Sequence, residues 1–196
     1  MNPTSNKSDF EDLTTNLKDL AYSYLEKYSP SKQQLKVFLL KKYLTKIKGA
    51  ASKREVSTII DEIIINLEKN RIVNDELYSD SKARMFLRRG YSLNKINQSL
   101  RHKGIDSKHI KKTIDKIKED EIEPDFVSAL KLCKWRRIGS LRSEANRELF
   151  YKKDMGILAR GGFSFDLSKR ILNLDQKEFN KLLKIAWFLL LFFLLY

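Results

Sequence analysis

Lysine and arginine side chains, which bind phosphates and carboxylates, are concentrated in two segments of this chain. Residues 76–112 contain ten of them against three acids, and residues 131–153 contain eight against two. Such basic segments are typical of proteins that bind nucleic acid or acidic protein surfaces. The residues that we select as contacts to a partner protein or to DNA are Arg84, Arg88, Arg89, Lys95, Arg101, Lys103, Arg136 and Arg137.

A simpler interpretation of these basic residues is that they are ordinary solvated helix ends, where cations complement the helix dipole. Against it, residues 55–76 and 115–125 each carry six acids and two basic residues, so charge is grouped in alternating blocks. Arg142 joins Arg136 and Arg137 in a second candidate patch. For this second patch both interpretations stay open, and the role of Trp135 beside it is left unassigned.

Residue types that carry catalysis occur without the neighbours that catalysis needs. Gly161-Gly162 lacks the spacing of a phosphate-binding loop and the Lys-Ser/Thr that follows it. His102 and His109 have no clustered carboxylates, so we expect no metal site. Cys133 is the single cysteine and has no histidine partner in the sequence. We therefore predict no catalytic residues and no cofactor, and we predict that the protein is not an enzyme.

The elements that position the basic residues are predicted to be helices. The chain has 196 residues, 42% of them hydrophobic, and its 7 glycines and 3 prolines are too few for a β-sandwich or barrel. Apolar residues recur every three or four positions over residues 56–67, and no segment alternates with a period of two. Ser29 followed by Pro30 is a predicted helix start, and Gly90 and Gly104 are predicted helix ends. The predicted fold class is all-α.

A short pattern occurs three times along the chain: a leucine, a polar stretch, an aromatic residue and a serine that opens the next helix. Its aromatic residues are Tyr28, Tyr91 and Phe163. We predict core contacts for them rather than base stacking, because one aromatic at the same turn of each repeat is typical of packing. The pattern predicts three tandem three-helix repeats in an elongated, curved body. We assign them to residues 13–75, 76–125 and 126–180, after a flexible N-terminus over residues 1–12.

The last twelve residues, Ile185–Tyr196, carry no charged side chain. Three interpretations stay open for this C-terminal tail, which we delimit as residues 181–196. The tail packs on the third repeat, touches a membrane surface, or carries no selected role. A twelve-residue helix is about 18 Å long against a bilayer core of about 30 Å, so we do not expect membrane contact. No secretory signal is visible, and we expect a cytoplasmic protein.

Two stretches of the chain combine the repeated turn with a characteristic sequence. Residues 72–105 read IVNDELYSDSKARMFLRRGYSLNKINQSLRHKGI, and residues 154–172 read DMGILARGGFSFDLSKRIL. They resemble the RecX family of bacterial recombination regulators, in the Arg-Arg-Gly-Tyr turn, the Lys-Gly-Ile helix end and the Leu-Ala-Arg-Arg-Gly-Phe-Ser segment. Gly161 stands where the family has its second basic residue. The resemblance extends over residues 17–174 and is weakest in the first repeat.

The resemblance implies a small all-α modulator rather than an enzyme. Members of this family bind the filament of the RecA recombinase and inhibit its ATPase, strand-exchange and co-protease activities, which modulates recombination, DNA repair and the SOS response. The implied partners are therefore this filament and, weakly and in a salt-dependent way, single- and double-stranded DNA. We expect a monomer without a cofactor. The alternatives are a non-specific or helix-turn-helix DNA-binding protein and a helical scaffold for a partner other than DNA.

Overall fold

The computed structural model describes residues 3–47 and 52–194, and all regular elements within these ranges are helices. This confirms the predicted all-α class. The helices are α1 (Pro3–Leu25), α2 (Lys32–Lys42), the π-helix η1 (Tyr43–Ile47), α3 (Lys53–Lys69), α4 (Asp75–Arg88), α5 (Leu93–His102), α6 (Ser107–Asp120), α7 (Pro124–Arg136), the 3-10 helix η2 (Gly139–Leu141), α8 (Glu144–Arg160), α9 (Phe165–Leu172) and α10 (Gln176–Leu194).

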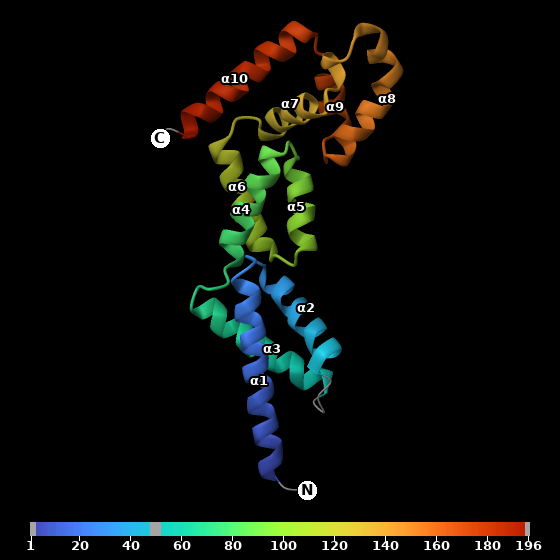
Figure 1. Ribbon diagram of the computed structural model, residues 1–196. Helices are drawn as coiled ribbons and strands as arrows, with labels where there is room; N and C mark the ends of the chain where they lie inside the picture. Colours follow the sequence, from blue (N-terminus) through green and yellow to red (C-terminus); the bar gives the residue numbers. More distant parts are fainter. Residues whose placement is uncertain (1–2, 48–51, 195–196) are drawn as a thin grey trace. The chain divides into compact units, whose positions relative to one another are not determined.

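The chain divides into two compact units, which are described separately. Unit 1 comprises Met1–Ser79 and Arg101–His109. Its core lies among α1, α2 and α3, which pack against one another (Figure 1). The apolar stripe predicted over residues 56–67 is confirmed, because all six of its members on α3 are buried. Burying one such aliphatic side chain contributes about 1.5–3 kcal/mol, so this stripe is a main source of the stability of unit 1.

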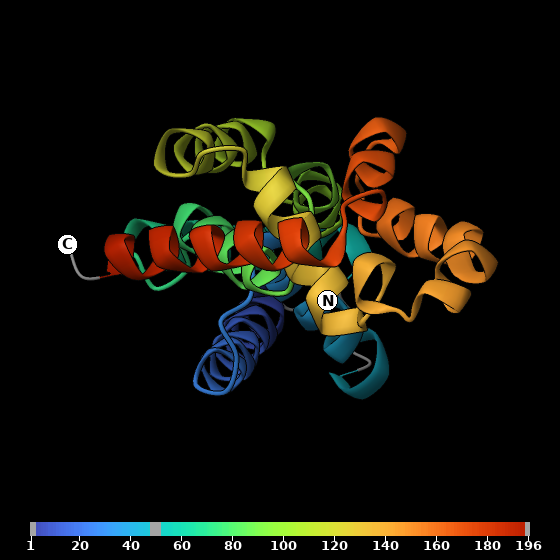
Figure 2. The ribbon, with the colours of Figure 1, turned by 90° about the horizontal axis from the view of Figure 1, so that it is seen from above.

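Unit 2 comprises Asp80–Leu100 and Ile110–Tyr196. Its main core joins α7, α8, α9 and the start of α10, around fully buried side chains such as Leu130, Leu158 and Phe179. Helix α10 lies across α7 (Figure 2). Elsewhere in the unit α4 is tied to α6, since the Thr113 hydroxyl donates a 2.7 Å hydrogen bond to Asp80 Oδ1. These contacts fix α4, which carries two of the predicted binding residues, Arg84 and Arg88, and is followed directly by a third, Arg89.

The two ends of the chain are helical where they are described. Helix α1 begins at Pro3, so the predicted flexible N-terminus over residues 1–12 is helical from that residue onward. At the other end, α10 includes most of the apolar tail, and Leu183 and Ala186 are buried in unit 2. Side chains beyond Ala186 lie outside the described part of the tail. Within the described residues, no helix is long and apolar enough to cross a bilayer.

Serine residues cap α2, α5 and α9 in the same way. The hydroxyl oxygens of Ser31, Ser92 and Ser164 accept hydrogen bonds from the backbone N–H groups three residues later, at 3.1–3.2 Å. The prediction that Ser29 caps the first of these helices is wrong, because Ser31 forms a complete capping box with Gln34. Proline has no N–H and lies just before this cap at position 30, not within the helix.

This shift also explains the outcome for the three repeated aromatic residues. Counted back from the cap, Pro30 takes the position that Tyr91 and Phe163 occupy in the later turns, and it is buried. Phe163 is buried as predicted, and Tyr91 is half-buried with its ring edge-on to Phe86 at 5.7 Å. The core assignment of Tyr28 is wrong, since its side chain is 59% exposed. The number of repeats stays a prediction, which the three equivalent caps support.

Candidate functional site

The C-terminal end of α4 presents Arg84, Arg88 and Arg89, all exposed. The helix ends at Gly90, which has a φ of 75°, a conformation that glycine adopts without strain. A Cβ atom at Gly90 would lie 2.8 Å from the backbone nitrogen of Leu132 on α7. Glycine therefore lets the end of α4 approach the backbone of α7, and this approach fixes where the arginines emerge.

The turn after Gly90 is held by two other segments of unit 2. The N–H of Ser92 donates a 3.1 Å hydrogen bond to the carbonyl of Gly161, and the N–H of Leu93 donates one of 2.7 Å to Asp125 Oδ1. A Cβ atom at Gly162, whose φ is 89°, would meet the Ser92 hydroxyl and lie 2.8 Å from the Lys95 Cβ. The two characteristic sequence stretches, far apart in the chain, therefore meet at these turns.

The C-terminal end of α7 carries the second candidate patch. Arg136 and Arg137 are exposed, and the guanidinium of Arg136 lies 4.9 Å from the ring centroid of Trp135. Arg137 adopts a left-handed φ of 53°, and the N–H of Ile138 returns to the carbonyl of Cys133 at 3.1 Å. This reversal ends α7 and leaves both arginines at its exposed tip.

Arg142 does not belong to this patch, which corrects the grouping expected from the sequence. Its guanidinium donates two hydrogen bonds of 2.7 Å to the carboxylate of Asp154, which is buried. The same carboxylate accepts the N–H of Gly139 at 3.0 Å, and the guanidinium lies 4.7 Å from the ring of Phe150. The hydrogen bonds to Asp154 raise the pKa of Arg142. Arg142 is therefore a structural residue that neutralises a buried carboxylate.

The remaining predicted contacts are divided between the two units. Lys95, on α5, is half-buried and belongs to unit 2 with the arginines described above. Arg101 and Lys103 are exposed and belong to unit 1. The carbonyl of Lys103 accepts a 2.7 Å hydrogen bond from the hydroxyl of Ser31, which ties the end of α5 to the start of α2. The structure thus gathers six of the eight predicted residues in one unit.

An acidic residue moderates the charge of Arg84. Glu121 follows α6 and is half-buried, and this burial raises the pKa of its carboxyl group, while the charges of Lys131 and Arg84 act in the opposite direction. Burial also lowers the pKa of Lys131, partly offset by Glu121. The sequence gives no sign of this cluster, because its members come from three separate helices or helix ends.

Two aspartates that position the turns share a sequence signal. Asp75 Oδ1 accepts the N–H of Lys32 at 2.9 Å, just as Asp125 does for Leu93. Each donor is the first residue of a short helix, and each acceptor lies at the start of the helix that begins the next predicted repeat. The sequence signal that could have predicted this second cap of α2 and α5 is therefore the aspartate that follows each long predicted helix.

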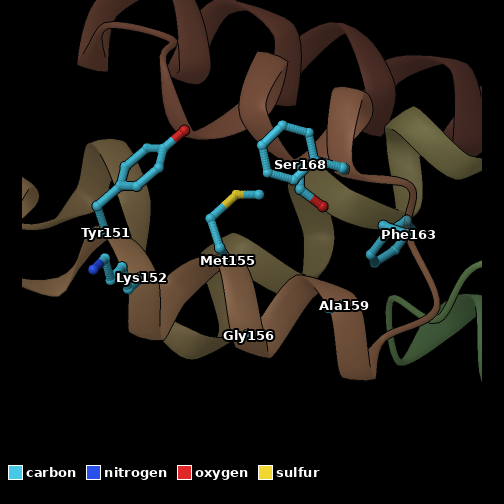
Figure 3. A pocket seen from close by; sticks show the side chains of 8 residues that line it. Tyr151, Lys152, Met155, Gly156, Ala159, Phe163 and Ser168 are labelled. Carbon is cyan, nitrogen blue, oxygen red and sulfur yellow. The ribbon is translucent and has the colours of Figure 1, made fainter.

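A pocket of about 460 Å³ is lined by residues of α8 and α9 and of the turn between them. Figure 3 shows the thioether of Met155 reaching toward the space between Tyr151 and Ser168. The other lining residues include Phe163, and Lys152 is the charged one. Such a lining offers no pair of groups for acid–base chemistry. In the core of unit 2, burial and a contribution from Asp154 raise the pKa of the Cys133 thiol to about 12, so this thiol is unreactive at neutral pH.

Comparison with known proteins places these features among bacterial regulators. No protein-family model matches the chain. It is 31% identical over 161 residues to the regulatory protein RecX of Myxococcus xanthus, covering 81% of this chain and 85% of that protein. RecX of Corynebacterium efficiens is 32% identical over 123 residues, covering 59% of this chain and 57% of that protein. A crystal structure of regulatory protein RecX superposes with a TM-score of 0.60 and 20% identity, covering 89% of this chain and 79% of that chain.

Proposed function

The chain belongs to the RecX family of regulatory proteins, and from this membership we propose that it binds the filament of the RecA recombinase. In this proposal the protein inhibits the ATPase, strand-exchange and co-protease activities of the filament, and thereby modulates recombination and DNA repair. It acts as a monomer and needs no cofactor.

One observation carries this proposal beyond family membership. The two characteristic stretches meet where Ser92 bonds to Gly161, and the exposed Arg88 and Arg89 emerge beside that junction. Glycines at the junction allow backbone segments to approach more closely than any side chain would permit. A rigid turn that presents cations is suited to an acidic protein groove or a phosphate backbone.

Occupancy is the mechanism that fits such a surface. A helical protein with fixed basic residues that lies across neighbouring recombinase protomers stabilises one filament conformation. It then opposes the conformational change that ATP turnover and strand exchange require. The inhibition needs no chemical step by the protein itself.

The direct test is the recombinase ATPase on single-stranded DNA, titrated with this protein. We expect turnover to fall to a low plateau as the filament becomes saturated, and strand exchange to fall over the same concentration range. Serum albumin at equal concentration is the control for non-specific effects. Undiminished ATPase at saturating protein contradicts the proposal.

DNA binding is a second candidate function, supported by the exposure of seven of the eight predicted contact residues. A net charge of +14 favours association with any polyanion. We propose that the protein binds single- and double-stranded DNA weakly, with strong dependence on salt. Fluorescence anisotropy of a labelled oligonucleotide at several salt concentrations measures this binding without the recombinase.

A further inference from the structure

Trp135 is a large aromatic side chain that the core does not use. It lies in the last turn of α7, and its side chain is 65% exposed. The neighbouring Arg136 places its guanidinium 4.9 Å from the indole centroid. A cation at this distance from an aromatic ring is attracted by the negative face of the ring and restricts its rotation. The indole is thus exposed and at the same time oriented.

The segment around Trp135 is strongly basic. Residues 131–143 include five lysines or arginines and no acid. Among them, Arg142 binds Asp154 and Lys131 interacts with Glu121, both acids from other segments. Arg136 and Arg137 are exposed beside the indole. The surroundings of Trp135 therefore attract a polyanion, and its ring offers an apolar face of the size of a base.

We propose that Trp135 is a stacking site for an unpaired nucleobase, with Arg136 and Arg137 neutralising the adjacent phosphates. The proposal rests on the DNA binding proposed above and adds a preference to it. An aromatic side chain stacks on an unpaired base of any sequence. In a duplex the base faces are already stacked on one another, and separating them costs free energy. Trp135 therefore favours single strands over duplexes, whereas the arginines serve both.

Charge favours a nucleic acid over a protein as the occupant. Tryptophan and arginine also form the energetic centres of protein interfaces, but there they lie in desolvated pockets from which surrounding contacts exclude water, and further charged residues are depleted. Here the indole lies at an exposed helix end among cations. A contact between Trp135 and a protein partner is therefore treated as an outcome of the test.

The sequence has two tryptophans, Trp135 and Trp187. The experiment uses the full chain with Trp187→Phe, which leaves Trp135 as the single source of tryptophan fluorescence. Its fluorescence is followed during titration with a twenty-nucleotide thymidine oligomer, with an abasic oligomer of equal length, and with a duplex. We expect the thymidine oligomer to quench the fluorescence strongly. The abasic oligomer has the same phosphates without bases, and we expect it to bind with little quenching.

Substitutions at Trp135 measure how much the stacking contact contributes to DNA affinity. The affinities are determined from the fluorescence anisotropy of the labelled oligomers. Trp135→Ala should weaken binding of the thymidine oligomer about tenfold or more, and should change binding of the abasic oligomer and the duplex less than about twofold. Trp135→Phe keeps a ring and should recover part of the loss. Phe165→Ala removes an aromatic side chain of similar exposure, 68%, that precedes Asp166, and it should change none of the three affinities.

Two outcomes overturn the stacking proposal while DNA binding stands. One is equal weakening of the thymidine and abasic oligomers by Trp135→Ala, and the other is unchanged binding of all three ligands. In the second case, a simultaneous loss of recombinase inhibition assigns Trp135 to a protein contact. If no oligonucleotide binds at low salt, DNA binding itself fails along with the stacking site. The ATPase assay, read separately, then decides on the proposed regulatory function.

Discussion

Burial changes the proton affinity of Glu121. Its carboxyl group is half-buried at the end of α6, and desolvation raises its pKa above the ordinary value of 4.5. The positive charges of Lys131 and Arg84 limit this increase. Because the folded state binds the proton more tightly than the unfolded state, Glu121 contributes stability below pH 4.5 that is lost as the pH rises through the raised pKa.

We predict that an NMR titration of the Glu121 carboxyl carbon has its midpoint above pH 4.5. Lys131→Met should move this midpoint further upward, because it removes an attraction that favours the carboxylate. Glu121→Gln should remove the corresponding part of the pH dependence of unfolding by urea. A midpoint at or below 4.5 in the parent protein contradicts the burial that the structure shows.

The three arginines at the C-terminal end of α4 and directly after it are predicted to act on the partner and not on the fold. Arg84, Arg88 and Arg89 are exposed, and exposed substitutions usually change the free energy of unfolding by less than about 0.5 kcal/mol each. Reversing all three to glutamate should raise the concentration for half-inhibition of the recombinase ATPase by about tenfold or more, since lost interfacial charge pairs cost about 2 kcal/mol or more each. Thermal melting, measured in parallel, should fall by only a few degrees.

The matched control reverses Lys177, Lys181 and Lys184, which are exposed on α10 and give the same change in net charge. It should inhibit almost as well as the parent. Equal inhibition by the α4 variant and the α10 control would show that the arginines are not the contact surface.

Tyr91 is predicted to behave in the opposite way to these arginines. Its ring is half-buried and edge-on to Phe86, so Tyr91→Ala should lower the free energy of unfolding by about 1 kcal/mol or more. Inhibition by the protein that remains folded should be retained. A variant that melts normally yet fails to inhibit would make Tyr91 a binding residue.

At the scale of elements, glycines decide how closely the helices approach. The backbone of α7 leaves no room for a side chain at Gly90, whose φ of 75° also disfavours other residues. Gly156, within α8, is the contrasting case, because a Cβ there would meet only the end of Arg160, at 3.4 Å. One glycine is therefore required by the packing, and the other is a replaceable helix residue.

We predict that Gly90→Ala lowers the free energy of unfolding by about 2 kcal/mol or more, from left-handed strain and the clash with α7 together. Gly156→Ala should raise it by about 0.5–1 kcal/mol through helix propensity alone. Urea unfolding followed by circular dichroism measures both. A neutral Gly90→Ala would mean that the two helices do not meet as described.

Elements were predictable from the sequence where their signals are local. The stripe of α3 and the helix ends at Gly90 and Gly104 depend on residues within one or two turns, and these predictions are confirmed. The capping serine of α2 was misplaced, because two serines flank Pro30 and both satisfy the local pattern. Arg142 was grouped with its neighbours in sequence, because no local pattern predicts that Asp154, twelve residues later, is buried and binds it.

At the scale of the whole molecule, the charge of +14 is divided into basic and acidic segments. Its predicted effect on DNA is electrostatic, since phosphate contacts release condensed counterions. The basic segment over residues 76–112 has ten cations. Nearby acids, such as Glu121, whose charge interacts with that of Arg84, reduce how many of these cations can meet phosphates.

We predict that contact with about five phosphates gives a slope near −4.5 for the logarithm of the duplex binding constant against the logarithm of salt concentration, and a shallower slope on single strands. Anisotropy titrations between low and physiological salt give this slope. A flat response would show that the basic segment does not contact nucleic acid.

The aspartate caps of α2 and α5 have a consequence for how the protein is made. The bond from Lys32 to Asp75 spans 43 positions, and the bond from Leu93 to Asp125 spans 32. During synthesis on the ribosome, the first N–H of α2 therefore forms its native hydrogen bond only after Asp75 has left the exit tunnel. The same delay recurs for α5. Each of these two helices therefore gains its second cap only after translation has begun the next predicted repeat.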